Sequence, residues 1–265
     1  MKQKYIVASF SGGKDSTAML LHMIEIGEHI DEVVCCDTYK EFPAMYRHID
    51  KVKGIVERAG IKFTVLKNPK SFDYLMFEHD VKRKNKSLQG NRGYSWAGNR
   101  SRWCTSKLKV DVINRYFKEL NTHYEVVQCV GIAADEQYRL ERENNKKLSQ
   151  RHPLVEWCWT EKDCLEYCYS NGFDWEGLYR LFSRVSCWCC PLQPLGELKN
   201  LRKHFPDLWE ELKGMDRRTW RQFKSDYSVD DLEIRFALED EFEVLGKSTR
   251  SREFYDELNG RLVKR

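Results

Sequence analysis

The sequence lacks a long apolar segment: no run approaches the roughly 18 residues that a membrane-spanning helix needs. Internal repeats and low-complexity tracts are also missing. A signal peptide is not expected, because residues 1–4 lead directly into the first predicted strand. Together with 41% hydrophobic and 32% charged residues, these absences predict a globular, cytoplasmic protein without a membrane partner.

A strong excess of one charge is missing too. The 45 Lys and Arg against 41 Asp and Glu leave a net charge of +4, which allows a nucleic-acid partner without requiring one. The length of 265 residues suits one large domain, or one domain with an appendage. In a cytoplasmic protein, the ten cysteines indicate buried thiols or metal ligands rather than disulfides.

The Walker spacing of phosphate-binding loops is absent, but another glycine loop, SGGKDS at residues 11–16, lies between a predicted strand and a predicted helix. Glycines let backbone amides approach a ligand, and a helix N-terminus favours anions. Lys14 adds a full positive charge, and two serines add hydroxyls. The pattern predicts a phosphate site; the alternative is a tight turn in which Asp15 or Ser16 caps the helix.

The first half of the chain alternates between predicted strands and helices. The strands are expected at residues 5–10, 32–37, 62–67 and 125–132, with the third near a sheet edge and Pro43 opening a helix. This rhythm predicts an α/β fold, a doubly wound and mainly parallel sheet. Ligands collect at the carboxyl ends of such strands, so residues 11–16, 37–41 and 131–136 are expected to form one site.

Two further regions differ from this rhythm. Residues 82–98 carry a basic run and then glycines among Asn, Arg, Tyr94 and Trp96, which predicts either a solvated loop or a surface that binds a polyanion. After residue 194 the pattern becomes helical and charged. We therefore predict an α/β domain over residues 1–193 and a helical C-terminal extension over residues 194–265.

A second Cys-x-x-Cys pair is missing, although Cys187 and Cys190 form one around Cys189. Cys104 is the best distant partner, so the candidate metal ligands are Cys104, Cys187, Cys189 and Cys190. The spacing alone leaves structural thiols, a zinc site and an iron–sulfur cluster as alternatives. Most of the other cysteines are expected in the core.

Several segments together resemble one family. SGGKDS is similar to the PP-loop of the ATP pyrophosphatases, which cleave ATP between the α and β phosphates. Residues 36–43 resemble the Asp-Thr-Gly-x-x-Phe-Pro segment of the phosphoadenylylsulfate reductases, and residues 102–109, 131–136 and 153–163 resemble later motifs of that family in the same order. The resemblance covers roughly residues 5–193 and implies an adenine nucleotide alpha hydrolase-like, Rossmann-like fold.

Two departures separate the chain from those reductases. It has no cysteine after Cys190, whereas the reductases use a catalytic cysteine in a C-terminal motif. Its loop is intact, whereas theirs is degraded. Relatives with an intact loop and clustered cysteines insert sulfur into DNA or tRNA. The resemblance therefore implies a sulfurtransferase that adenylates an acceptor oxygen.

The cofactors implied are ATP, Mg²⁺ and a 4Fe-4S cluster, with zinc as the alternative metal. A tRNA or DNA acceptor and a sulfur-donor protein are the implied partners, and Asp37 or Asp135 can hold the Mg²⁺. Two other functions stay open: reduction of adenylyl sulfate or its phosphorylated form, and a non-catalytic nucleotide- or RNA-binding module with structural zinc. The expected catalytic residues are Lys14, Asp15 and Asp135, and the expected nucleotide-binding residues are Ser11, Gly12, Gly13, Lys14, Asp15, Ser16, Asp37, Thr38 and Gly131.

Overall fold

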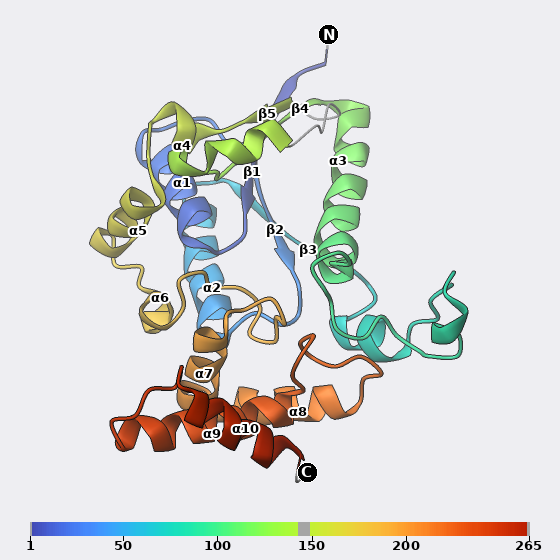
Figure 1. Ribbon diagram of the computed structural model, residues 1–265. Helices are drawn as coiled ribbons and strands as arrows, with labels where there is room; N and C mark the ends of the chain where they lie inside the picture. Colours follow the sequence, from blue (N-terminus) through green and yellow to red (C-terminus); the bar gives the residue numbers. More distant parts are fainter. Residues whose placement is uncertain (1, 143–148, 264–265) are drawn as a thin grey trace. The chain divides into compact units, whose positions relative to one another are not determined.

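The computed structural model describes residues 2–142 and 149–263, with the side chains of residues 141 and 142 left aside. Contacts divide the chain into two units (Figure 1). The first unit comprises Met1–Phe72 and Trp103–Cys187, and the second comprises Asp73–Arg102 and Trp188–Arg265. Residues 73–102, which lie between the third and fourth strands in the sequence, therefore belong to the same unit as the C-terminal helices, whereas residues 103–124 stay with the sheet.

The first unit is built on a five-stranded sheet in which every neighbouring pair is parallel. The spatial order β3-β2-β1-β4-β5 reverses direction at β1, which is the doubly wound, Rossmann-like arrangement. The predicted fold class is thus confirmed, and β3 lies at an edge as expected. The strands are β1 (Lys4–Phe10), β2 (Glu32–Asp37), β3 (Lys62–Lys67), β4 (Glu125–Val130) and β5 (Ser149–Arg151).

Helices cover both faces of this sheet (Figure 1). On one face, α3 (Asp111–His123) places Phe117 against Val7, Val34 and Val126. On the other lie α1 (Lys14–Glu25) and α2 (Pro43–Arg58), which Pro43 opens as predicted. The other elements of the unit are the π-helix η3 (Thr105–Val110), the 3-10 helices η4 (Ala134–Arg142) and η5 (Trp175–Gly177), and the α-helices α4 (Pro153–Glu156), α5 (Glu161–Ser170) and α6 (Leu178–Leu181).

The fifth strand escaped prediction because three polar residues carry no hydrophobic period. Polar side chains hold it in place. Gln150 Nε2 donates to Gln128 Oε1 at 3.1 Å, and Gln128 Nε2 donates to Ser9 Oγ at 2.7 Å. A row of amides and a hydroxyl therefore links β5, β4 and β1.

The second unit is helical over its described residues. Its insertion contains the π-helix η1 (Tyr74–Glu78) and the 3-10 helix η2 (Lys86–Leu88). Its C-terminal part contains α7 (Leu195–His204), α8 (Pro206–Arg217), α9 (Val229–Val244) and α10 (Arg252–Val263). Leu238 and Phe242 of α9 pack with Phe254 and Leu258 of α10, which gives this unit an apolar core of its own.

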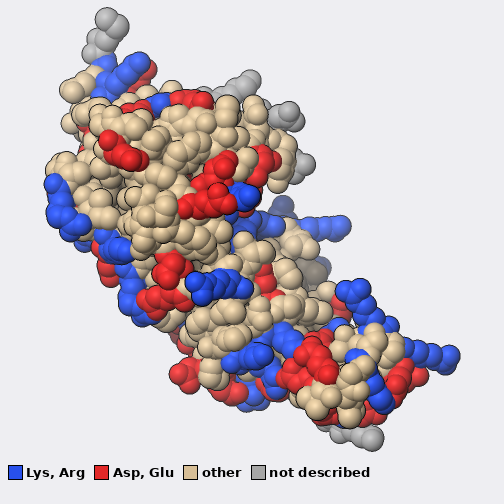
Figure 2. All heavy atoms as spheres, turned by 90° about the vertical axis from the view of Figure 1, so that its left-hand side faces the viewer, with Lys and Arg blue, Asp and Glu red and all other residues tan. Residues whose placement is uncertain are grey.

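The helices in the described ranges are all too short or too polar to cross a bilayer. On the face drawn in Figure 2, basic and acidic side chains lie intermingled.

Candidate active site

The 11–16 loop joins the end of β1 to the first turn of α1. Gly12 has a φ of +81°, and a Cβ there would lie 2.6 Å from Met45 Sδ. Glycine is therefore required both by the backbone conformation and by close packing against α2. Gly13 is the N-cap of α1 and no side chain caps the helix, so the alternative of a turn in which Asp15 or Ser16 caps the helix does not hold. The Lys14 amide donates to Tyr179 Oη at 2.8 Å, so an anion at this helix start would meet the next two amides of the first turn, those of Asp15 and Ser16.

Ser11 and Ser16 are hydrogen-bonded to each other across the loop. Their hydroxyl oxygens lie 3.0 Å apart, and the Ser11 amide donates to Ser16 Oγ at 3.1 Å. Ser16 Oγ in turn donates to the Gly13 carbonyl at 3.1 Å. Ser11 and Ser16, which were predicted to bind the nucleotide, thus form hydrogen bonds within the loop that stabilise its conformation.

Lys14 lies at the centre of an acidic environment, with its side chain only 11% exposed. Its ammonium pairs with Glu161 at the start of α5 and lies 3.2 Å from Asp15 Oδ1. Burial alone would lower the pKa of Lys14, but the hydrogen bond that it donates to Glu161 and the neighbouring negative charges raise it above its ordinary value. Lys14 is therefore a permanent cation at the helix N-terminus.

Asp135 supports Lys14 indirectly. Its Oδ1 accepts a hydrogen bond of 3.0 Å from the Glu161 amide, which fixes the start of α5. Glu161 then presents its carboxylate to Lys14. The predicted residues Asp135 and Lys14 are thus brought together through Glu161, a residue that the motifs did not single out.

Asp15 has an unsatisfied carboxylate oxygen. Its Oδ1 is buried and accepts no hydrogen bond within the described part of the chain, although Lys14 Nζ is near. Burial raises the pKa of Asp15, and the Lys14 charge opposes that shift without cancelling it. A buried carboxylate oxygen without a hydrogen-bond donor is suited to a hard cation such as Mg²⁺.

Gly131 allows β4 to end against the loop. A Cβ on Gly131 would lie 2.9 Å from Ser16 Cα and 3.1 Å from the Asp15 carbonyl carbon, both atoms of the backbone. Only glycine permits this approach. It also explains why β4 stops at Val130, two residues earlier than predicted.

A wall of aromatic residues behind the loop was missed in the sequence. Trp175 Nε1 donates to the Gly12 carbonyl at 2.8 Å, and the Lys14 amide donates to Tyr179 Oη at 2.8 Å. His48 stacks on Trp175 at 4.5 Å and hydrogen-bonds Thr17 at 3.0 Å. No local motif marks these contacts, since more than 160 residues separate Gly12 from Trp175 and Lys14 from Tyr179.

Asp37 is already engaged by protein groups. Lys67 Nζ lies 2.7 Å from Oδ2, and Oδ1 accepts from the Tyr39 amide at 2.7 Å and from Tyr46 Oη at 3.0 Å. Burial would raise the pKa of Asp37, but these three donors together lower it below its ordinary value. Its contacts thus shape the end of β2.

Thr38 belongs to a second polar group in the same unit. Its hydroxyl donates to Glu41 Oε1 at 2.7 Å and lies 3.4 Å from Cys187 Sγ. Lys109 Nζ lies 4.0 Å from the same Glu41 oxygen. Partial burial would lower the pKa of Lys109, but Glu41 and the thiols of Cys187, Cys36 and Cys35 raise it. One cation therefore faces a carboxylate and several sulfur atoms.

The four candidate ligand cysteines fall in both units. Cys104 and Cys187 belong to the first unit, and Cys189 and Cys190 belong to the second. Burial raises the pKa of Cys104, which the Lys109 charge opposes, so Cys104 and Cys187 respond to the same ammonium. Across the described ranges, no three His, Cys, Asp or Glu side chains form a ready metal-ion site.

Four of the six remaining cysteines lie in the core, as expected for most of them. Cys35, Cys129, Cys164 and Cys168 are buried, and burial raises the pKa of Cys129 to about 11. Cys36 is half-buried, and Cys158 is exposed.

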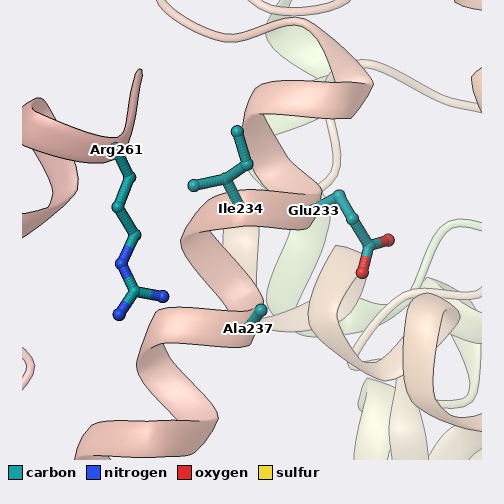
Figure 3. A pocket seen from close by; sticks show the side chains of 4 residues that line it. All are labelled: Glu233, Ile234, Ala237 and Arg261. Atoms are coloured by element: carbon teal, nitrogen blue, oxygen red, sulfur yellow. The ribbon is translucent and has the colours of Figure 1, made fainter. Parts of the chain in front are cut away.

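A cavity of about 420 Å³ lies in the second unit, whereas these cysteines and the loop belong to the first. Its lining residues, Glu233, Ile234 and Ala237 of α9 and Arg261 of α10, are drawn in Figure 3. The Arg261 guanidinium forms ion pairs with Glu241 and Glu257.

Comparisons with known proteins agree with this architecture. Residues 5–193 match the model of the phosphoadenosine phosphosulfate reductase domain, and the chain belongs to that family. Two uncharacterized proteins of Methanocaldococcus jannaschii, MJ0066 and MJ0973, are 27% and 26% identical over 231 and 215 residues. These matches cover 81% and 79% of this chain but 42% and 47% of those proteins, so the chain spans less than half their length.

A solved structure, the U34-tRNA thiolase NcsA from Methanococcus maripaludis with its [4Fe-4S] cluster, is 15% identical to the chain. The alignment covers 81% of this chain and 71% of that protein, with a TM-score of 0.37. A likeness of that strength carries no inference about this chain.

Proposed function

We propose that the protein is an ATP-pyrophosphatase-type enzyme that adenylates an acceptor oxygen so that sulfur can replace it. The observation that carries the proposal is the loop at the start of α1, where Lys14 and the first-turn amides lie beside the unsatisfied Asp15 oxygen. Membership of the phosphoadenosine phosphosulfate reductase family supports nucleotide chemistry at this sheet edge. The acceptor is proposed to be an oxygen of a nucleic acid, tRNA or DNA.

The chemistry follows from the charges at the loop. The acceptor oxygen attacks the α phosphorus of ATP, and the bond to the α–β bridging oxygen breaks so that pyrophosphate leaves with the electron pair. Negative charge grows on the phosphate oxygens during this step. Lys14 and the α1 amides stabilise it from fixed positions, which need no reorganisation during the reaction. A sulfur nucleophile then displaces AMP from the acceptor.

Glu161 and Asp135 act as positioning residues in this proposal. Glu161 holds the Lys14 ammonium, and Asp135 holds the Glu161 amide. Before ATP binds, Glu161 keeps the Lys14 ammonium charged and oriented. When ATP binds, its phosphate competes with Glu161 for this ammonium.

Asp15 is the residue that we assign to Mg²⁺, because its buried Oδ1 accepts no hydrogen bond within the described residues, whereas both oxygens of Asp37 and Oδ1 of Asp135 are engaged by protein groups. When bound, the ion supplies charge neutralisation on the phosphates. The proposed cluster would be held by the candidate cysteines, of which Cys104 and Cys187 interact with the Lys109 charge, and that charge would offset the negative charge of thiolates. When bound, such a cluster supplies a site for the incoming sulfur.

The test follows the products of labelled ATP. The protein, purified anaerobically, is incubated with α-³²P-ATP, Mg²⁺, sulfide and either bulk tRNA or duplex DNA. Acceptor-dependent release of AMP and pyrophosphate is the expected result. Lys14→Met should lower the rate by about 10² or more, because one preorganised electrostatic contact is lost. Release of orthophosphate alone, or tight ATP binding without turnover in a zinc-loaded protein, would refute the proposal.

The matched control is Lys53→Gln. Lys53 is a partly exposed lysine of α2 that lies 3.8 Å from Glu57, outside the loop. Its substitution removes the same charge and should leave AMP release unchanged. Equal losses in both variants would show that general charge, and not the position of Lys14, matters.

Reduction of phosphoadenylyl sulfate is the second candidate, and the family of the domain favours it. It predicts sulfite formation from that nucleotide and a thiol, without ATP. The sequence has no cysteine after Cys190 to serve as the C-terminal nucleophile. Sulfite formation by the wild-type protein would reverse the order of the two candidates.

A further inference from the structure

The positive charge of the chain is concentrated in one segment. Residues 80–102 contain seven Lys or Arg and one Asp, a net charge of +6. The rest of the chain contains 38 Lys or Arg and 40 Asp or Glu, a net charge of −2. The small net charge of +4 therefore combines a basic segment with a slightly acidic remainder. We call residues 80–102 the basic insertion.

The cations of the basic insertion differ from those of the C-terminal helices in what they contact. In those helices the arginines are matched by carboxylates: Arg202 by Glu233 and Asp240, Arg217 by Asp230, and Arg261 by Glu241 and Glu257. Six cations of the basic insertion are exposed and pair with no carboxylate among the described residues. They are Lys82, Lys84, Lys86, Arg92, Arg100 and Arg102.

The seventh cation holds the basic insertion in shape. The Arg83 guanidinium donates to the carbonyl oxygens of Asn91, at 2.8 Å, and of Gly93. Gly93 is buried with a φ of +65°, and a Cβ there would lie 2.0 Å from the Met76 carbonyl oxygen. The Gly93 amide donates to the His79 carbonyl at 2.9 Å. These contacts fold the segment onto η1.

The basic insertion is also fastened to the C-terminal part of its own unit. Trp96 is 1% exposed, and its Nε1 donates to Asp216 Oδ1 at 2.7 Å. Trp220 Nε1 donates to the Arg92 carbonyl at 3.1 Å, and the Arg83 guanidinium lies 5.0 Å from the Trp220 ring centre. Trp96 is therefore buried within its own unit and is not available to stack on a base.

We propose that the basic insertion is a binding surface for the phosphodiester backbone of a nucleic acid. Unpaired exposed cations gain from phosphates through the release of condensed counterions, whereas paired ones do not. Because backbone contacts already order the segment, binding has less conformational entropy to overcome. With Trp96 buried, recognition depends on phosphates and not on base stacking, so affinity is insensitive to base sequence.

This inference deepens the proposed function, because it names the surface that holds the acceptor, but it is tested by binding without ATP. Fluorescence anisotropy with labelled bulk tRNA and a labelled 30-base-pair DNA duplex is measured from about 50 to 300 mM salt. The triple variant Lys82→Gln, Lys84→Gln, Lys86→Gln removes three exposed cations. It should weaken duplex binding by on the order of 10² at 0.1 M salt and reduce the slope of log K against log[salt] by about 2.7, since each duplex phosphate contact contributes about 0.9.

The matched control removes the same charge elsewhere. Lys4→Gln, Lys118→Gln, Lys203→Gln changes three exposed lysines outside the basic insertion and should keep the wild-type slope. Circular dichroism and thermal unfolding confirm that both variants are folded. Equal slopes for the two triple variants, absent nucleic-acid binding, or binding only to anionic phosphatidylserine vesicles would overturn the inference.

The outcomes for the two proposals are separable. Salt-dependent binding that needs Lys82, Lys84 and Lys86, with no AMP release on any acceptor, supports the surface and refutes the activity. AMP release that is unaffected by the triple variant, at limiting acceptor, refutes the surface and keeps the activity.

Discussion

His48 makes the stability of the loop region dependent on pH. The imidazole is 5% exposed, packs against Trp175 at 4.5 Å and Phe173 at 5.6 Å, and hydrogen-bonds Thr17. Burial lowers the pKa of His48 to about 4, and the Lys51 charge acts in the same direction. The folded protein therefore holds this ring in its neutral form at neutral pH.

The magnitude follows from linkage. In the unfolded chain His48 binds its proton near its ordinary pKa of 6.5, and in the folded state only near 4. The contribution of His48 to stability is thus fully present above pH 6.5 and is lost as the pH falls toward 4. The free energy of unfolding should fall by about 2 kcal/mol at pH 5 and about 3 kcal/mol at pH 4 through this group alone.

Urea unfolding of the wild type and of His48→Gln between pH 4 and pH 7.5 measures this effect. The variant is expected to be less stable at pH 7.5, because its amide packs less well against Trp175. Its stability should, however, fall less steeply below pH 6.5, since it lacks the titrating ring. Parallel pH profiles for the two proteins would refute the reasoning.

Three further predictions concern single contacts. Gly131→Ala places a Cβ 2.9 Å from Ser16 Cα and should lower stability by about 1–3 kcal/mol and weaken ATP binding, measured by urea unfolding and calorimetry; Gly196→Ala in α7, where nothing lies within 4 Å, should not. Trp175→Phe keeps a ring but removes the 2.8 Å hydrogen bond to the Gly12 carbonyl, which keeps only the 3.5 Å contact from Thr17 Oγ1; the expected cost is about 1–3 kcal/mol in urea unfolding, and an unchanged midpoint would contradict this role. Cys104→Ala should lower the metal and sulfide content of anaerobically purified protein, whereas the exposed Cys158→Ala should retain it; intact metal in the first variant removes Cys104 from the ligands.

The site was predictable where a local pattern had a local cause. The 11–16 loop could be identified because its glycines meet a steric need, seen at Gly12 with its positive φ. Gly131 could be placed with the loop because parallel strands share one carboxyl edge. Asp37 lies at that edge too, but which donors occupy its oxygens depended on Lys67 and Tyr46, which no spacing rule connects to it.

The sequence by itself determined the parallel sheet and the position of the loop. Strands 1 to 4 are marked by apolar or alternating runs, and Pro43 marks the start of a helix, because these signals act over a few residues. They need no knowledge of distant partners.

Only the tertiary structure decided which distant polar groups meet. Glu161, Trp175 and Tyr179 contact the loop from 147, 163 and 165 residues away, and residues 73–102 join the C-terminal helices. The physical reason is that single hydrogen bonds and ion pairs have no sequence period. The cost of closing a long loop also rises slowly with its length, so many distant pairings are open until the whole chain packs.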